Sequence, residues 1–248
     1  MKTAERHRLK TNEFAEQVAT ATEFWTTHRS KVTTAAVVAL VLLAAVAGYT
    51  AYRQNRTAKA GAALAEAMAV AAAPVTPAAV PGSTPPPQAA GSYASTEARD
   101  KAALEKFQAV AAQYGSTQAG LAAKYRAAAL LAQLGRRADA EREFRAVVQQ
   151  GSGGIYGRMA QLGLAEVQVQ AGQYDPAIAT FREALAKGDT DLPADGVLMQ
   201  LGRACLPAGK TSEALQAFTR LVDEHPQSLY VAEARREIDA LKTTAGKS

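Results

Sequence analysis

The chain contains 248 residues, of which 48% are hydrophobic, 21% charged and 6% aromatic. This composition excludes a wholly disordered chain and provides enough apolar residues for a globular core plus one further apolar segment. The net charge is +5, yet the residues after position 95 include nineteen basic and eighteen acidic side chains. A nucleic-acid-binding domain would concentrate positive charge on itself, so nucleic acid is excluded as a partner. Basic residues beside an apolar segment suit anionic lipid headgroups instead.

An uncharged stretch of 21 residues, VTTAAVVALVLLAAVAGYTAY, occupies positions 32–52. With a rise of about 1.5 Å per residue, a helix of this length spans the roughly 30 Å hydrocarbon core of a bilayer. Lys31 and Arg53 bracket the stretch, and Tyr49 and Tyr52 fall where tyrosine is enriched at membrane interfaces. We therefore predict a transmembrane helix over 32–52, which contacts membrane lipid.

Two other interpretations of this stretch fit the sequence less well. A cleavable signal peptide has a short preceding region and an apolar stretch of about 7–15 residues, whereas 31 residues precede this longer one. A helix buried in a soluble domain would carry a polar face, which the Ala, Val and Leu content does not provide. The sequence favours a retained anchor.

The orientation of the anchor follows from the basic residues that flank it. The counts close to the membrane are nearly balanced on the two sides. The whole tail 1–31 carries six basic and four acidic residues, which favours a cytoplasmic N-terminus by the positive-inside rule. We predict a cytoplasmic tail over 1–31 and a bacterial inner-membrane, single-pass protein whose C-terminal part is periplasmic.

Two segments of contrasting composition follow the anchor. Residues 53–72 are Ala-rich and are predicted to form a juxtamembrane helix. Residues 73–95 contain most of the prolines of the chain, which prevents a helix or a central strand there. We interpret this second segment as an extended, semi-rigid loop or spacer.

The remainder, 96–248, repeats at a fixed interval. An Ala-x-x-x-Phe pair recurs four times with a spacing of 37 residues, and a turn glycine keeps the same step. The pairs are Ala103/Phe107, Ala140/Phe144, Ala177/Phe181 and Ala214/Phe218, and the glycines are Gly135, Gly172 and Gly209. Coincident steps of this kind indicate a repeat array.

The content of each repeat resembles the tetratricopeptide pattern, in which small residues let two antiparallel helices approach closely and Phe fills the space towards the next repeat. The last unit matches best, at Leu198, Leu201, Gly202, Ala214, Phe218, Leu221 and Pro226. The resemblance predicts an all-α tetratricopeptide-type solenoid over 96–248. It begins with a half-unit at 96–113, whose partner helix is expected in the Ala-rich stretch, and ends in a capping helix at 229–242.

A protein-binding groove is expected on the first helix of each repeat. At about 100° per residue, the positions opposite the core-facing ones form a separate face. Two methionines, a leucine and a tyrosine make that face adaptable and partly apolar. Some of its residues could instead pack against neighbouring helices. The predicted groove comprises Tyr125, Arg126, Met159, Leu162, Glu166, Gln170, Met199, Gln200 and Arg203.

No pattern of catalytic or metal-ligating residues stands out. The single cysteine, Cys205, excludes an intramolecular disulfide and is expected to be a small buried hydrophobe, and the three histidines lie far apart. The stretch 204–211 resembles a loose phosphate-binding loop, but it follows a helix instead of a strand. We expect no enzyme activity, no cofactor and no metal.

The arrangement of EFAEQVATATEFWTTHRSK, one apolar span ending in Gly-Tyr, an Ala-rich helix and repeats resembles the bacterial YfgM-like family. These proteins are ancillary Sec translocon subunits with one membrane helix and a periplasmic tetratricopeptide domain. The resemblance implies contact with the translocon and work beside a membrane-anchored prolyl isomerase chaperone. The long proline-rich segment departs from the compact family pattern.

A second resemblance leads to a different role. The segments 114–117 and 225–228, each followed by an Ala-containing helix, look like periplasmic repeats of envelope proteins such as the Tol-Pal coordinator and the outer-membrane assembly lipoprotein. The lipoprotein itself is excluded because no cysteine lies near the apolar segment. The alternative function is therefore an envelope scaffold for cell division or outer-membrane assembly.

Overall fold

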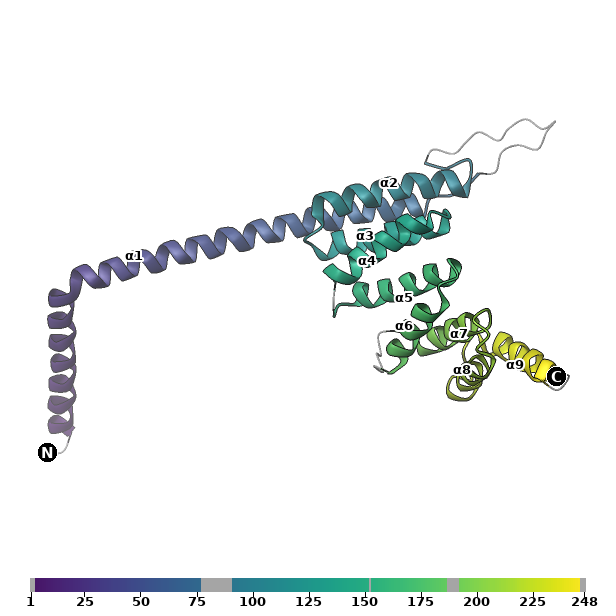
Figure 1. The fold of residues 1–248 in the computed structure, drawn as a ribbon. Coiled ribbons are helices and arrows are strands. Elements are labelled where there is room, and N and C mark those ends of the chain that lie inside the picture. The colour runs from purple at the N-terminus through teal and green to yellow at the C-terminus, as the bar shows by residue number, and fades with distance from the viewer. Residues whose placement is uncertain (1–2, 77–90, 152, 187–191, 246–248) are drawn as a thin grey trace. The chain divides into compact units, whose positions relative to one another are not determined.

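A computed structural model describes residues 3–76, 91–151, 153–186 and 192–245 (Figure 1). All regular elements in these ranges are helices, as predicted, and the β interaction that occurs there is an isolated bridge between Val75 and Tyr93. The helices are α1 (Thr3–Ala71), α2 (Thr96–Tyr114), α3 (Gln118–Gln133), α4 (Arg137–Gln150), α5 (Ile155–Gln170), α6 (Tyr174–Ala186), α7 (Ala194–Cys205), α8 (Thr211–Glu224) and α9 (Val231–Ala245). The chain divides into two compact units, 1–56 and 57–248.

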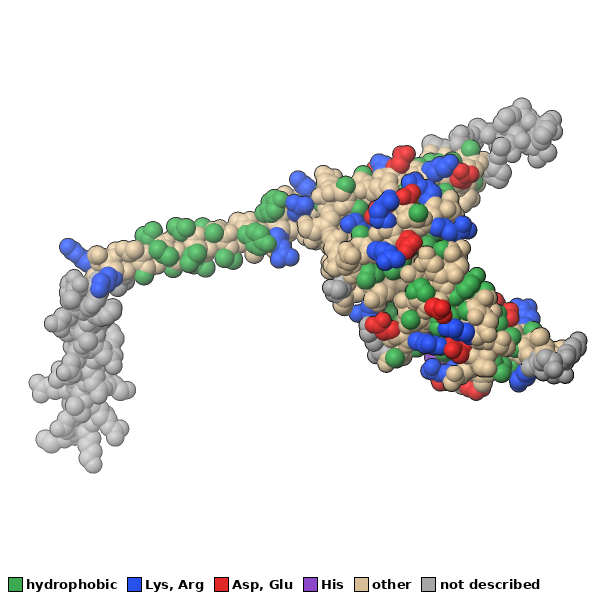
Figure 2. Space-filling model, in the orientation of Figure 1, with side chains coloured by type: hydrophobic (Ala, Val, Ile, Leu, Met, Phe, Trp, Pro, Cys, Tyr) green, Lys and Arg blue, Asp and Glu red, His purple; other side chains and the backbone are tan. Residues whose placement is uncertain are grey.

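The first unit contains an apolar helical segment whose described side chains are exposed. The most apolar window of α1 has a mean hydropathy of 2.2 and none of it is buried. Figure 2 shows its hydrophobic side chains with Lys and Arg at either end. The hydroxyls of Thr33, Thr34 and Thr50 donate to carbonyls of the preceding helical turn at 2.7–3.0 Å. The polar groups of these three side chains are thus satisfied inside the helix, as an apolar surrounding requires.

Tyrosine and arginine pair where the apolar segment ends. The Arg53 guanidinium carbon lies 5.9 Å from the centre of the Tyr49 ring, and Arg56 donates a hydrogen bond of 3.1 Å to the Tyr52 hydroxyl. Such amphipathic pairs are suited to a boundary between apolar and aqueous surroundings. Among the described residues, this is the one helix long and apolar enough to cross a membrane.

The second unit is a helical array in which each helix from α2 to α9 packs against the next in the sequence. The four repeat pairs occupy equivalent buried positions. Their alanines are fully buried and their phenylalanines are at most 3% exposed. Helices α4, α6 and α8 begin at Arg137, Tyr174 and Thr211, which preserves the 37-residue step. The predicted repeat register is confirmed.

The turn within each repeat ends the first helix in the same way. Gly135, Gly172 and Gly209 have φ of +74°, +76° and +72°. In each turn the residue after the glycine donates from its N–H to the carbonyl five residues earlier, at 2.8–2.9 Å. This is the Schellman arrangement, in which the left-handed residue is usually glycine because a Cβ is unfavourable there.

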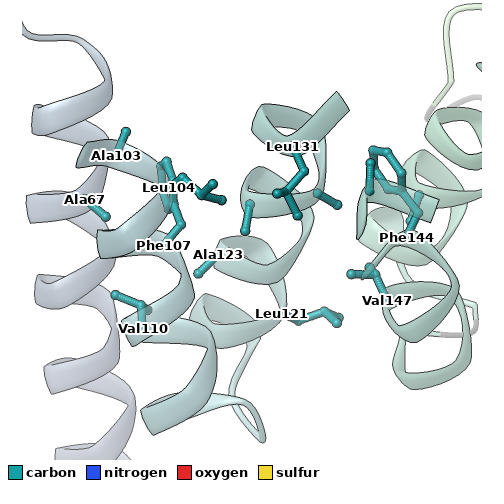
Figure 3. Packing of buried hydrophobic residues seen from close by; sticks show 14 of the residues in the cluster. Ala67, Ala103, Leu104, Phe107, Val110, Leu121, Ala123, Leu131, Phe144 and Val147 are labelled. Atoms are coloured by element: carbon teal, nitrogen blue, oxygen red, sulfur yellow. The ribbon is translucent and has the colours of Figure 1, made fainter. Parts of the chain in front are cut away.

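The alanine-rich end of α1 supplies the first helix of the array. Ala60 and Ala67 are fully buried. Figure 3 shows Ala67 beside α2, near Ala103 and Phe107, and Glu66 pairs with Lys106 of α2 at 2.6 Å. The sequence placed 53–72 outside the repeat domain, but the compact repeat unit starts at Thr57. The partner expected for the half-unit is confirmed.

The proline-rich segment therefore joins two helices of one pair. Thr76 donates from its N–H to the Tyr93 carbonyl at 2.9 Å, and Tyr93 donates to the Pro74 carbonyl at 3.0 Å. These two hydrogen bonds hold the ends of the segment together, so it is a loop within the array and not a spacer in front of it. Residues 77–90 lie outside the described residues.

The buried side chains form two clusters that share α5. Ala160 and Val167 of α5 belong to the cluster built with α1 to α4, while Ala165 belongs to the cluster built with α6 to α9. The terminal helix α9 contributes Ala234 to the second cluster, with Ile238 partly buried against it. A helix with one packed face and one polar face closes a solenoid, as the sequence indicated.

Candidate protein-binding face

The first helices of successive repeats line one side of the array. Helix α3 contacts α5, and α5 contacts α7, although α4 and α6 respectively separate them in the sequence. In an array of helix pairs, the helices that approach their equivalents most closely lie on the inside of its curvature. We call the side formed by α3, α5 and α7 the inner face, and it is where the sequence places the groove.

Eight of the nine predicted groove residues are at least partly accessible. Arg126, Glu166, Gln170 and Arg203 are exposed, and Tyr125, Met159, Leu162 and Gln200 are partly buried. Leu162 packs at the edge of the second cluster. The accessible part of this face is therefore more polar than the sequence suggested.

Met199 does not line the groove, and this part of the prediction is wrong. It is 1% exposed and belongs to the second cluster with its neighbours Val197 and Leu198. Helix α7 packs against both α6 and α8 and also touches α5. A helix enclosed on several sides buries residues that a helical wheel with one buried and one exposed face assigns to the exposed face.

An aromatic cluster stands at the junction of three helices. The Tyr125 ring centre is 5.9 Å from that of Phe144 on α4 and 6.1 Å from that of Tyr156 on α5. Burial raises the pKa of Tyr125, and the nearby Glu166 carboxylate raises it further while Arg126 lowers it. The Tyr125 phenol therefore stays neutral at physiological pH, and its hydroxyl can donate and accept hydrogen bonds.

Glu166 itself is electrostatically unfavourable where it stands. Partial burial of the carboxyl raises its pKa, although the residue as a whole is exposed. No described side chain offsets this penalty with a hydrogen bond or an ion pair. A carboxylate that lacks compensation inside the protein can gain it from a bound partner.

Two other residues of the inner face are held by neighbouring helices. Arg137 of α4 donates from Nε to the Gln170 side-chain oxygen at 3.4 Å. Arg203 pairs with Glu233 of α9 at 2.6 Å between Nη2 and Oε1. These contacts agree with the alternative that part of the predicted groove packs against adjacent helices.

A pocket missed by the sequence analysis lies at the first repeat. This first-repeat pocket has a volume of about 300 Å³ and lies between α1, α2 and α3. Its lining includes Met68, Arg99, Asp100, Phe107, Arg126 and Leu130. Of these lining residues, Arg126 is the one that also belongs to the predicted groove. The α1 side of the pocket has a helical signal in the sequence. Ala60 and Ala67 lie seven positions apart with Leu64 between them, which gives one face of α1 the spacing of a packed helix.

The phosphate-loop-like stretch has an ordinary structural role. It comprises the end of α7 and the Schellman turn at Gly209, and Lys210 pairs with Asp175 at 2.7 Å. Cys205 is fully buried in the second cluster, as expected. Within the described ranges, no group of three or more His, Cys, Asp or Glu side chains could hold a metal ion.

Comparisons with known proteins agree with this architecture. The family model of the tetratricopeptide repeat-like domain matches residues 22–242. No curated protein matches the chain. One similar solved structure is a single-site variant of nearly identical TPR-like repeats, which are ascribed to a kinesin light chain of Podosopora anserina. It is 17% identical to this chain. It covers 60% of this chain and 80% of its own at a TM-score of 0.52, which shows a likeness of fold.

Two further solved structures are similar over the same share of the chain. The Podosopora anserina repeats without that substitution are 17% identical, with 90% of their own chain covered and a TM-score of 0.47. The MamA RS-1 ArsTM double mutant is 18% identical, with 89% of its chain covered and a TM-score of 0.46. Both alignments cover 60% of this chain.

Proposed function

The chain belongs to the tetratricopeptide repeat-like domain family, and from that premise we propose that it is a membrane-anchored protein-interaction module. Its repeat unit binds polypeptide segments on the inner face, and its apolar helix holds that unit at a bilayer. The finer proposal is an ancillary subunit of the Sec translocon that works with periplasmic chaperones, its repeats on the periplasmic side.

Support for the anchor comes from the unpartnered apolar surface of α1. Leu40 and Leu43 are 68% and 70% exposed, and the apolar window contains no buried residue. Exposing such a surface to water is unfavourable by about 25 cal/mol per Å², so a lipid surrounding stabilises it. The excess of basic residues in 1–31 favours a cytoplasmic N-terminus and hence periplasmic repeats.

Support for binding instead of catalysis comes from the side chains of the inner face. It combines aromatic rings, partly buried methionine and leucine, and exposed ionic groups, which suits recognition of a peptide. One observation carries the proposal: the inner face formed by α3, α5 and α7 presents accessible residues from each of these helices.

Site-specific photocrosslinking in cells tests this proposal. A crosslinking amino acid at Glu166 or Gln170 on the inner face should capture partner proteins. The same amino acid at Arg145, an exposed position on α4, is the matched control and should capture few. Equal capture from both faces would remove the basis for the inner face as the binding site.

Identification of the captured proteins then separates the two candidate roles. Translocon subunits and a membrane-anchored prolyl isomerase would support the first, whereas Tol-Pal or outer-membrane assembly proteins would support the envelope-scaffold alternative. Protease added to spheroplasts should cleave the repeat unit. A repeat unit that stays protected until the membrane is lysed would contradict the proposed periplasmic orientation.

A further inference from the structure

We propose that the first-repeat pocket binds a peptide segment that places an apolar side chain next to a carboxylate. The inference rests on the proposed binding function and specifies the partner chemistry at one end of the array. Its basis is a pocket with an apolar floor and a cationic rim, formed by helices from two successive helix pairs.

The apolar part of the pocket is preformed. Phe107 is 2% exposed and forms part of its floor, while Met68 at 46% exposed stands beside it. Met68 is one of the few large apolar side chains exposed in the described part of the repeat unit. A flexible thioether beside a rigid aromatic ring adapts to different aliphatic side chains. The volume of about 300 Å³ is at the small end for a ligand site, which suits one or two side chains of a peptide.

The charge of the pocket is positive. Arg99 donates from Nε and Nη2 to the same oxygen of Asp100, at 3.0 and 2.9 Å, so this pair is neutral overall. Arg126 is exposed, and no described carboxylate lies within ion-pair distance of it. A guanidinium at the rim of an apolar pocket can form two parallel hydrogen bonds with a carboxylate. Charge complementarity thus selects an acidic peptide over a basic one.

Two larger hollows of the array differ in this respect. One of about 610 Å³ contains Arg182 and Arg220, which pair with Glu213 and Glu224. Another of about 930 Å³ contains Lys101 and Arg136, which pair with Glu97 and Asp139. Because these cations are compensated internally, neither hollow offers an unpaired cation to a partner. The first-repeat pocket is distinguished by Arg126.

Peptide binding by the full-length protein in detergent micelles tests the proposal. The probes are two fluorescein-labelled peptides of equal length, one with leucines separated by aspartates and one with the aspartates replaced by lysines. Fluorescence anisotropy should show the aspartate peptide binding at least about tenfold more tightly, the discrimination expected of a charged hydrogen-bonded pair. The preference should weaken as salt is raised, since the rim is exposed.

Variants assign the effect to the pocket. Arg126→Glu should reverse the preference in favour of the lysine peptide, and Met68→Ser should weaken both. Arg235→Glu, at an exposed position on α9, makes the same charge change and should leave both affinities unchanged. Circular dichroism spectra that match the wild type show that the variants are folded.

Other results would overturn the proposal. Equal affinity for the two peptides, or an unchanged preference in Arg126→Glu, rules out recognition of a carboxylate at this pocket. If neither peptide binds while crosslinks form from the inner face in cells, the pocket assignment fails but the binding function stands. If the crosslinks are also absent, the proposed function itself fails.

Discussion

Single glycines decide how closely neighbouring helices of the array can pack. A Cβ at Gly202 would lie 2.3 Å from the nearest ring carbon of Phe218, the phenylalanine of the same helix pair. A Cβ at Gly163 would lie 2.6 Å from the Phe144 ring. The rings occupy the space that the missing side chains leave, so the glycine and the buried phenylalanine form one packing unit.

Gly202→Ala tests this packing. The added methyl cannot fit without displacing the fully buried Phe218 ring, and we expect a loss of about 1–3 kcal/mol in the free energy of unfolding. Urea denaturation followed by circular dichroism measures it. Gly61→Ala is the control, because nothing lies within 4 Å of its Cβ position. It should be neutral or gain up to about 1 kcal/mol of helix propensity.

Glu166 gives a prediction about pH. Burial raises the pKa of its carboxyl in the folded state, so the folded state holds a proton that the unfolded state releases as pH rises. The ionised carboxylate therefore lowers stability above its folded pKa and has no such effect below its unfolded pKa.

Glu166→Gln should accordingly raise the urea midpoint at pH 7. The difference from wild type should shrink towards zero at about pH 3.5, below the ordinary range of a glutamate. Paired urea titrations at the two pH values measure the change. A gain that is equal at both pH values would contradict the desolvation argument.

At the scale of elements, the alanine-rich end of α1 is the first helix of the array. Ala67 packs against α2, and Glu66 pairs with Lys106 at the edge of that contact. Small side chains allow the two helices to approach closely, as alanine and glycine do within the later repeats. The helix pair α1–α2 is thus the first unit of the array, with the proline-rich segment as its connecting loop.

Ala67→Leu tests whether α1 is part of the repeat core. The larger side chain has no room between α1 and α2, so we expect a loss of about 1–3 kcal/mol. Ala62→Leu places the same residue at an exposed position of the same helix and should change stability little. Thermal unfolding of both variants provides the comparison. Equal melting temperatures would mean that α1 does not pack on α2 in solution.

At the scale of the whole molecule, apolar surface is distributed in two different ways. In the repeat unit, it is enclosed in two clusters that share α5. In the apolar segment of α1, the described hydrophobic side chains are exposed and none of the most apolar window is buried. Water favours the first distribution, whereas the second calls for an apolar surrounding such as the lipid of the proposed anchor.

The anchor prediction follows from that difference. Replacing Leu40 and Leu43 together with Arg adds roughly 2.5–3.5 kcal/mol each to the cost of insertion at the bilayer centre. We expect the variant to leave the membrane fraction during alkaline carbonate extraction, while the wild type stays. Ala62→Arg, outside the apolar stretch, should stay with the wild type. Retention of the double variant would contradict a transmembrane helix at this position.

The sequence by itself determined the helical class, the 37-residue register, the turn glycines, the buried phenylalanines and the apolar helix. Each of these depends on local spacing or on the composition of one segment. Only the tertiary structure showed that Met199 is buried, that the repeat unit starts at Thr57, and that Arg126 stands at the rim of a pocket with Phe107 and Met68. Those features depend on which helices pack together, and helical periodicity describes the faces of one helix without specifying how many neighbours enclose it.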